Sequence, residues 1–278
     1  MTNKTPTIQT YIVDSFTDES FKGNPACVCL LNHGISDDLM LKIAKELNLS
    51  ETAFVKKLEG TKTYSIRFFS PKMEIPLCGH ATLASAKVLF DNNLNMNQIN
   101  FSNSQKLDLK IVRDNEMIVM EFPVYESVPK NASKELLNAL GINESILLNS
   151  EYNDETKILL LEIYNNKILI DLKPDFEALY KSHDSINGVL VTALSNKNDF
   201  DFESRYFWPW SGTNEDPVTG ATHTFLAKYW SKKLNKTKMN SIQCSERSGF
   251  MEVELTKKNT VLIKSTAKII FEGQLKIN

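Results

Sequence analysis

The sequence contains no apolar run that approaches the ~20 residues needed to cross a bilayer, and its first ten residues, MTNKTPTIQT, are polar. We therefore expect neither a membrane span nor a signal peptide, and we expect a cytoplasmic protein. The chain also lacks an excess of charge of one sign, because 32 Lys and Arg residues stand against 34 Asp and Glu residues. Since no basic patch stands out, nucleic acid and anionic membranes are not expected as partners.

The sequence also lacks the fingerprints of common cofactors. It has no Gly-x-Gly-x-x-Gly pattern, no phosphate-binding loop and no His-x-x-x-His pair among its four histidines. Its four cysteines, Cys27, Cys29, Cys78 and Cys244, do not have the spacing of metal ligands. Cys27 and Cys29 share one face of a predicted strand, so we expect them to be buried, reduced thiols. We therefore expect no metal, flavin, nicotinamide or pyridoxal phosphate.

What the sequence does contain is a mixture of many short strands and fewer helices. Apolar, β-branched runs predict strands at residues 10–13, 64–69 and 157–161, and helical apolar spacing predicts a helix over 37–47. Helices are few and are separated by several strands. This pattern favours an α+β fold with mostly antiparallel sheet over a doubly wound parallel sheet.

An internal repeat is the most informative feature of the chain. Residues 67–71, Arg-Phe-Phe-Ser-Pro, precede Gly79 and a predicted helix, and residues 205–209, Arg-Tyr-Phe-Trp-Pro, precede Gly220 and another. In both copies an Ala-Lys pair follows the glycine seven residues later. The loop before the glycine is three residues longer in the second copy. The repeat indicates a duplicated strand–loop–helix unit.

The duplication predicts two similar halves, each a curved, mostly antiparallel sheet around a central helix that starts near Gly79 or Gly220. We predict domains at residues 1–128 and 129–278, and we leave open whether the last strand packs on the first half. Helix N-termini carry unpaired N–H groups and a partial positive charge. Two such ends across one cleft would bind a small carboxylate, because glycine permits close approach to the backbone.

Three ionisable residues are candidates for catalysis, and each also has an ordinary structural explanation. His80 is either a core histidine or a proton-relaying imidazole, which a helix N-terminus would keep neutral. Asp216 is either a helix N-cap before Pro217 or a loop residue above a helix that begins nearer Gly220. Glu51 lies between a predicted helix and a predicted strand. It is either a solvated loop acid or the base that C–H abstraction requires.

Four segments resemble the PhzF-like isomerase family of phenazine biosynthesis. Residues 16–26, FTDESFKGNPA, resemble its opening signature, and residues 50–54, SETAF, match its catalytic glutamate motif. Residues 74–82, EIPLCGHAT, and 216–220, DPVTG, resemble one block from each half of the family's chain. Each motif alone is weak evidence for the resemblance, but all four occur in the family's order over most of the chain.

The resemblance implies a fold shared with diaminopimelate epimerase and a cofactor-free isomerase that is commonly a homodimer. Glu51 would be the general acid/base that moves a proton on carbon, and His80 and Asp216 would assist and orient a small-molecule substrate. The backbone of the two helix starts would hold the substrate carboxylate, at Gly79, Ala81, Gly220 and Ala221.

Three positions depart from the family pattern. Ala221 stands where serine is frequent, residues 247–249 read Arg-Ser-Gly where Arg-Gly-Gly is usual, and Lys264-Ser265 stand where a Gly-Gly pair is expected. These departures alter contacts and leave the proton-moving residues intact. They therefore bear on the identity of the substrate more than on the chemistry.

Three functions remain open at this point. A proton-transfer isomerase would use Glu51, whose pKa we expect apolar neighbours such as Phe54 to raise. A two-thiol racemase would use Cys78, but residues 217–218 (Pro-Val) occupy the place of the second thiol. A non-catalytic small-molecule binding protein would have kept the ligand-binding cleft without the catalytic activity. The sequence does not identify the substrate.

Overall fold

The computed structural model describes residues 6–277, so the first five residues of the polar N-terminal segment lie outside the described residues. The chain forms two compact units. Unit 1 comprises the residues up to Glu121 together with those from Lys264 onward, and unit 2 comprises Phe122–Ile263. The predicted boundary between residues 128 and 129 lies within unit 2. None of the helices in the described part of the chain is long and apolar enough to cross a membrane.

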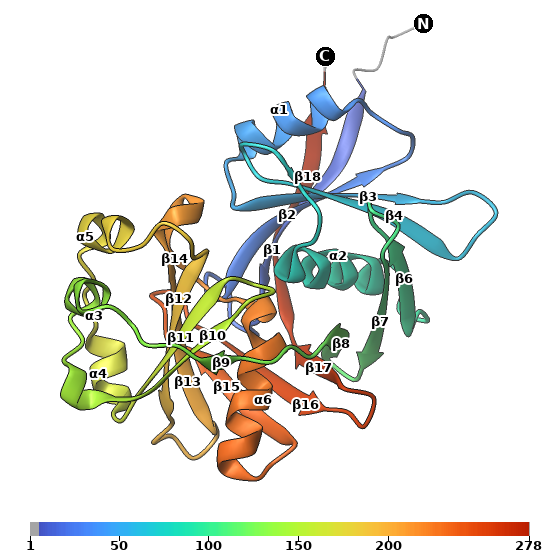
Figure 1. Ribbon diagram of the computed structural model, residues 1–278. Helices are drawn as coiled ribbons and strands as arrows, with labels where there is room; N and C mark the ends of the chain where they lie inside the picture. The colour runs from blue at the N-terminus through green and yellow to red at the C-terminus, as the bar shows by residue number, and fades with distance from the viewer. Residues whose placement is uncertain (1–5, 278) are drawn as a thin grey trace, which may run out of the picture. The chain divides into compact units, whose positions relative to one another are not determined.

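Unit 1 is a curved sheet with helix α2 (Gly79–Asn92) on its inner side (Figure 1). Pairing is antiparallel except that β2 runs parallel to β3 and β4 runs parallel to β6. Helix α1 (Asp37–Leu47) connects β2 to β3, and Ser36 caps it by accepting a hydrogen bond from the Leu39 N–H. The strands are β1 (Thr7–Ser15), β2 (Asn24–Leu31), β3 (Glu51–Lys57), β4 (Thr63–Phe69), β5 (Glu74–Ile75), β6 (Gln98–Ser102), β7 (Asp108–Asp114), β8 (Met117–Pro123) and β18 (Ala267–Lys276).

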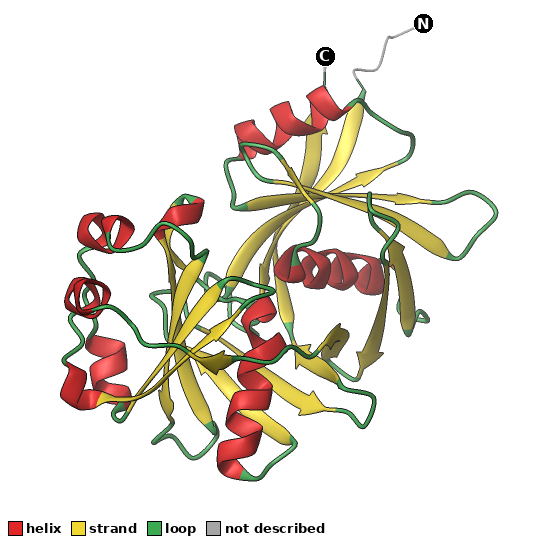
Figure 2. Ribbon diagram, viewed as in Figure 1, coloured by secondary structure: helices red, strands yellow, loops and turns green. Residues whose placement is uncertain are grey.

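Unit 2 has the same order of strand pairing. Strand β11 runs parallel to β12, β13 runs parallel to β15, and the other pairs are antiparallel. The strands are β9 (Val128–Pro129), β10 (Leu147–Asn153), β11 (Ile158–Ile163), β12 (Gly188–Leu194), β13 (Phe202–Trp208), β14 (Thr213–Asp216), β15 (Lys238–Gln243), β16 (Gly249–Leu255) and β17 (Thr260–Ser265). The helices are α3 (Lys134–Leu140), α4 (Asn166–Asp171), α5 (Phe176–Lys181) and α6 (His223–Leu234), with 3-10 turns at Glu144–Ile146, Pro209–Ser211 and Gly220–Thr222. Strands predominate over helices in both units (Figure 2).

The predicted repeat is confirmed by matching ion pairs. Arg67 on β4 donates from Nε and Nη2 to the two carboxylate oxygens of Glu74, at 2.8 and 2.6 Å. Arg205 on β13 makes the same bidentate pair with Glu215, at 2.8 Å for both bonds. The paired residues are seven positions apart in the first copy and ten in the second, so the longer loop lies between them.

The central helix of each unit is largely buried. Ten residues of α2 are buried, from His80 to Phe90, which explains why small and apolar residues fill it. In the second copy the helical segment begins at Gly220 as a 3-10 turn and becomes α-helical only at His223. The fold class predicted from the sequence is therefore confirmed, with this difference at the start of the second helix.

The turn between β1 and β2 supports the start of α2. Gly23 has a φ of +64°, and a Cβ there would lie 2.1 Å from the Ser15 carbonyl oxygen, so only glycine fits. The buried Asp14 carboxylate accepts the Phe21 N–H at 2.7 Å and fixes the turn. The Ser15 hydroxyl then donates to the His80 carbonyl oxygen at 2.7 Å. Phe21 and Gly23 of the opening signature thus shape the turn that follows Ser15, the residue that contacts His80.

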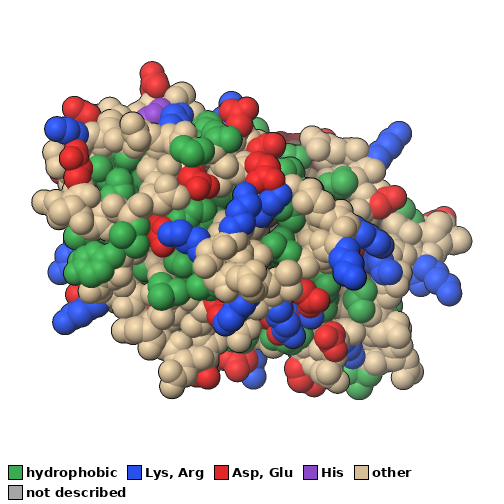
Figure 3. Space-filling model, turned by 60° about the horizontal axis from the view of Figure 1, so that its bottom comes forward, with side chains coloured by type: hydrophobic (Ala, Val, Ile, Leu, Met, Phe, Trp, Pro, Cys, Tyr) green, Lys and Arg blue, Asp and Glu red, His purple; other side chains and the backbone are tan. Residues whose placement is uncertain are grey.

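Charged side chains of both signs are interspersed on the face drawn in Figure 3, in keeping with the nearly balanced composition.

Candidate active site

Glu51 and His80 meet at the start of α2. Glu51 is the first residue of β3, and its Oε2 lies 3.0 Å from His80 Nε2. Both side chains are almost buried, with 12% and 10% of their surface exposed. The Ser50 hydroxyl lies 3.3 Å from the same ring nitrogen. Two of the residues predicted from separate motifs therefore form one hydrogen-bonded pair, and Glu51 is not a solvated loop acid.

The pair is electrostatically coupled. Burial acts to raise the pKa of the Glu51 carboxyl, but the hydrogen bond and charge of His80, with hydrogen bonds from Ser50 and Cys78, bring it below its ordinary value. Burial acts to lower the pKa of His80, but Cys78 and Glu51 raise it well above its ordinary value. We expected the opposite directions from the sequence. Both expectations were wrong, because contacts with Cys78 and Glu51 outweigh burial at His80, and contacts with His80, Ser50 and Cys78 outweigh burial at Glu51.

Cys78 completes a cluster of three. It is the N-cap residue of α2, and its Sγ lies 3.4 Å from His80 Nδ1 and 3.8 Å from Nε2. Burial raises the pKa of the Cys78 thiol above its ordinary value. Burial therefore disfavours the thiolate form of Cys78, and the charge of His80 opposes this effect.

The backbone at the start of α2 is accessible to a ligand. The Cys78 side chain makes no capping hydrogen bond to the first turn of the helix. A Cβ built on Gly79 would meet no other group within 4 Å, so open space borders the backbone there. Ala81 is buried in the same turn. Uncapped N–H groups beside open space suit an anion.

In unit 2, Asp216 ends β14 and is nearly buried. Its carboxylate accepts a hydrogen bond from the Thr219 hydroxyl, and its carbonyl oxygen accepts one from Gln243 Nε2 at 2.7 Å. The 3-10 turn begins at Gly220 with Thr219 as its N-cap. Asp216 is therefore the last residue of β14, ahead of the helix, and is not its N-cap. Gly220 is buried and Ala221 is exposed at this turn.

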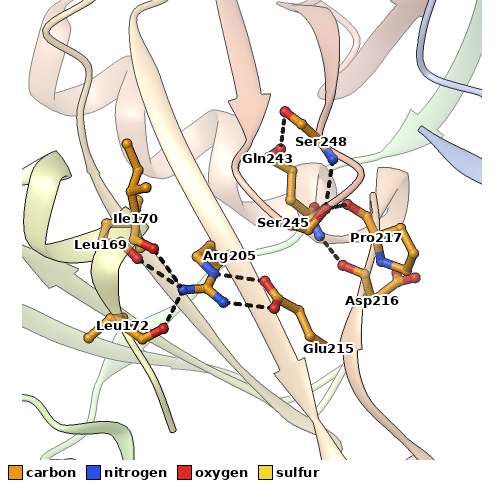
Figure 4. Close-up of polar contacts among 10 residues, drawn as sticks. All are labelled: Leu169, Ile170, Leu172, Arg205, Glu215, Asp216, Pro217, Gln243, Ser245 and Ser248. Atoms are coloured by element: carbon orange, nitrogen blue, oxygen red, sulfur yellow. Dashed lines mark hydrogen bonds and ion pairs between the residues drawn. The ribbon is translucent and has the colours of Figure 1, made fainter. Parts of the chain in front are cut away.

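One departure from the family pattern has a structural explanation, visible in Figure 4. Ser248 stands where glycine is usual and has a φ of +56°, in the region that favours glycine. Its N–H donates to Ser245 Oγ at 3.0 Å and its hydroxyl donates to the Gln243 carbonyl oxygen at 3.0 Å. Ser245 in turn donates to the Pro217 carbonyl oxygen at 2.6 Å. Glycine would also make the N–H bond, so the serine adds one hydrogen bond, from its hydroxyl, that offsets its backbone strain. Lys264 and Ser265 end strand β17.

The sequence reasoning did not identify His223, the first residue of α6. Its Nδ1 lies 3.2 Å from the Thr219 carbonyl oxygen and its Nε2 lies 3.0 Å from Ser241 Oγ. When Nδ1 of a neutral ring donates to the Thr219 carbonyl oxygen, Nε2 accepts from the Ser241 hydroxyl, whose alternative acceptor is the Met251 carbonyl oxygen at 3.3 Å. Burial lowers the pKa of His223 to about 4, although its hydrogen bonds to the backbone of Thr219 and Gly220 act in the opposite direction. This histidine is therefore a neutral structural group.

We expect the protein to lose stability in acid because of His223. Between its ordinary pKa and its folded pKa of about 4, the unfolded chain binds a proton that the folded chain does not. The free energy of unfolding should therefore fall as the pH falls, by about 2 kcal/mol from this group between pH 7 and pH 5. Urea unfolding at both pH values measures the loss. His223→Gln should show a smaller pH dependence than wild type, whereas a variant at the exposed His33, His33→Asn, should match wild type. If the free energy of unfolding falls equally with pH in wild type and His223→Gln, the lowered pKa of His223 is contradicted.

Comparison with known proteins finds relatives that match nearly the whole chain. The sequence profile of the family described as phenazine biosynthesis-like protein matches residues 13–273. Phenazine biosynthesis-like domain-containing protein 2 of Mus musculus is 40% identical, with 95% of this chain and 98% of the relative covered. An uncharacterized isomerase of Halalkalibacterium halodurans is 36% identical, with 94% and 96% covered.

Solved structures agree. A phenazine biosynthesis protein of the PhzF family from Enterococcus faecalis is similar with a TM-score of 0.90 at 36% identity, and 98% of this chain and 100% of that chain are covered. A hydroxyproline epimerase from Agrobacterium vitis, at 9% identity and a TM-score of 0.54, shares the fold alone, with 98% of this chain and 92% of that chain covered.

Proposed function

The chain belongs to the phenazine biosynthesis-like protein family, and on that premise we propose that it is a cofactor-independent isomerase that moves a proton on carbon of a small carboxylate-bearing substrate. The contact between Glu51 and His80 carries the proposal. It places a carboxylate and an imidazolium 3.0 Å apart beside an uncapped helix N-terminus. A base, an acid and an anion site are what such a reaction requires.

In the proposed reaction the ionised Glu51 takes a proton from a substrate carbon and becomes a carboxylic acid. The electron pair of the broken C–H bond delocalises into the adjacent unsaturated or carboxylate-bearing carbon system. The N–H groups at the start of α2 stabilise this negative charge. Glu51 then returns the proton to a carbon, and His80 keeps the carboxylate oriented through its Nε2–H bond.

The relatives support this class of reaction. One relative is named an isomerase, and a protein with the same fold is named an epimerase; both names denote rearrangement within one substrate molecule. The roles of Asp216, Gly220 and Ala221 in orienting the substrate remain predictions from the family resemblance. The substrate itself is not identified by these similarities.

The chain's other cysteines argue against the two-thiol racemase. Cys27 and Cys29 are fully buried in strand β2, as predicted. Cys244 donates to Glu203 Oε2 at 3.1 Å, and burial with this glutamate raises the pKa of its thiol to about 12. A neutral, hydrogen-bonded thiol is a poor base. A carboxylate base at Glu51 therefore explains the site better than paired thiols.

The proposal is tested by incubating the protein in deuterated water with a panel of unsaturated cyclic and linear amino and hydroxy acids. We expect one class to be converted and its product to carry deuterium at one carbon, because the Glu51 proton exchanges with solvent before it is returned. A ligand that raises the melting temperature but is neither converted nor labelled would instead identify a non-catalytic binding protein.

A further inference from the structure

Three side chains of different metal-binding types converge at the start of α2. Glu51 Oε2 lies 3.0 Å from His80 Nε2, and Cys78 Sγ lies 3.8 Å from the same nitrogen. One ligand atom from each of the three residues lies within 4.8 Å of the others. We refer to Glu51, Cys78 and His80 as the α2 cluster.

The spacing of the α2 cluster is close to that of zinc ligands. Zinc binds thiolate sulfur at about 2.3 Å and imidazole nitrogen or carboxylate oxygen at about 2.0–2.2 Å, so ligands around a tetrahedral ion are roughly 3.3–3.6 Å apart. The distances of 3.0 and 3.8 Å in the α2 cluster bracket this range. Small side-chain rotations would complete the geometry. A water molecule would be the fourth ligand, as in other zinc sites with three protein ligands.

The surroundings hold the cluster in place for a cation. The Ser15 hydroxyl fixes the His80 backbone by donating to its carbonyl oxygen at 2.7 Å. All three side chains are largely buried, so little rotamer freedom is lost when a metal binds. A sulfur, a ring nitrogen and one carboxylate favour zinc over magnesium or calcium, which prefer oxygen ligands alone.

We propose that the α2 cluster binds Zn²⁺ and that bound zinc inhibits the enzyme. The Cys78 thiol and the His80 imidazolium each release a proton to solvent as they become ligands, and Glu51 binds as the carboxylate that it already is. The Glu51 carboxylate, which is the base of the proposed reaction, is then bound to zinc and is not free to take a proton. Zinc binding stands independently of the proposed function, whereas the inhibition rests on it.

The binding is tested on the purified, metal-free protein with zinc by calorimetry and with Co²⁺ by absorption. We expect one zinc per chain and, with cobalt, a thiolate-to-metal band in the near ultraviolet. Cys78→Ser should abolish the band and weaken zinc binding by at least about 100-fold. Cys244→Ser is the matched control and should bind as wild type does, because its thiol donates to Glu203 and is not a member of the α2 cluster. Glu51→Gln, measured alongside, should also weaken zinc binding.

The outcomes separate the two proposals. A wild-type protein without a saturable zinc site, or a Cys78→Ser variant that keeps wild-type affinity with a native melting curve, would overturn the zinc site. Should Cys78→Ser fail to fold, the loss of binding in Glu51→Gln decides the question. Stoichiometric binding in a protein that converts no substrate would leave the zinc site in place and remove the proposed reaction. Conversion that is unaffected by saturating zinc would overturn the inhibition.

Discussion

Replacing Glu51 by glutamine is expected to lower turnover about 10²–10⁴-fold, the usual contribution of a positioned acid/base group. Glutamine keeps the size and one acceptor oxygen of the side chain, but it does not accept and return a proton. Substrate binding should survive, because the helix N-terminus and the open backbone at Gly79 are unchanged. Steady-state kinetics and a binding isotherm with the same substrate measure the two effects separately.

Two further variants sharpen this experiment. Glu59→Gln, at an exposed turn beyond the other end of β3, should leave turnover unchanged. His80→Asn should cost less in turnover and more in binding than Glu51→Gln, because it alters orientation beside the substrate carboxylate. A Glu51→Gln variant with near wild-type turnover would leave the proposed reaction without a base.

Replacing Arg205 by methionine is expected to destabilise the protein by about 3–5 kcal/mol, the cost of leaving a buried charge without its partner. The Arg205 side chain is 11% exposed and Glu215 is 18% exposed. Beyond the pair, Arg205 Nη1 donates to the carbonyl oxygens of Leu169, Ile170 and Leu172, at 3.3, 3.2 and 2.8 Å (Figure 4). Methionine fills similar volume but removes every one of these donors. Urea unfolding measures the change in free energy.

The repeat supplies the matched control for Arg205. Arg67→Met removes the equivalent pair in unit 1, where the side chain is 25% exposed and Asp37, its second partner, is 75% exposed. We expect a loss of at most about 1 kcal/mol there, because water replaces the lost contacts. Arg205→Met combined with Glu215→Met should recover part of the stability, since no unpaired carboxylate remains. Similar losses at the two arginines would contradict this account.

Local features of the fold were predictable from the sequence. Helix α1 was expected over 37–47 and occupies those residues, because its apolar spacing and its Ser36 cap agree. The repeat was predictable because Arg67 and Arg205 each precede a glycine-led helix at nearly the same spacing. Strands at 10–13, 64–69 and 157–161 correspond to β1, β4 and β11, with β11 beginning one residue late. These features depend on neighbours within a few residues.

The electrostatics of the candidate site were not predictable from the sequence. The sequence left open whether Glu51 is a solvated loop acid or a base in an apolar site, and burial does act to raise the pKa of its carboxyl. The direction of the pKa shift, however, depends on the distance between Glu51 and His80, which are 29 positions apart in the sequence. The pairing of β2 with β3 and the packing of α2 bring them together. The contact of Cys78 with the imidazole ring depends in the same way on the extended backbone of an N-cap residue.

The position of β18 sets the order in which the units are completed during synthesis. Strand β1 lies between β2 and β18, in register from Thr7 opposite Lys276 to Ser15 opposite Ala267. The ribosome releases β1 early, but its partner β18 emerges only after the whole of unit 2. Unit 2 is contiguous in sequence and has all its residues available first. The nascent chain therefore carries an unpaired edge on β1 throughout the synthesis of unit 2, and the unit that holds Glu51 and His80 is the last to acquire all its strands.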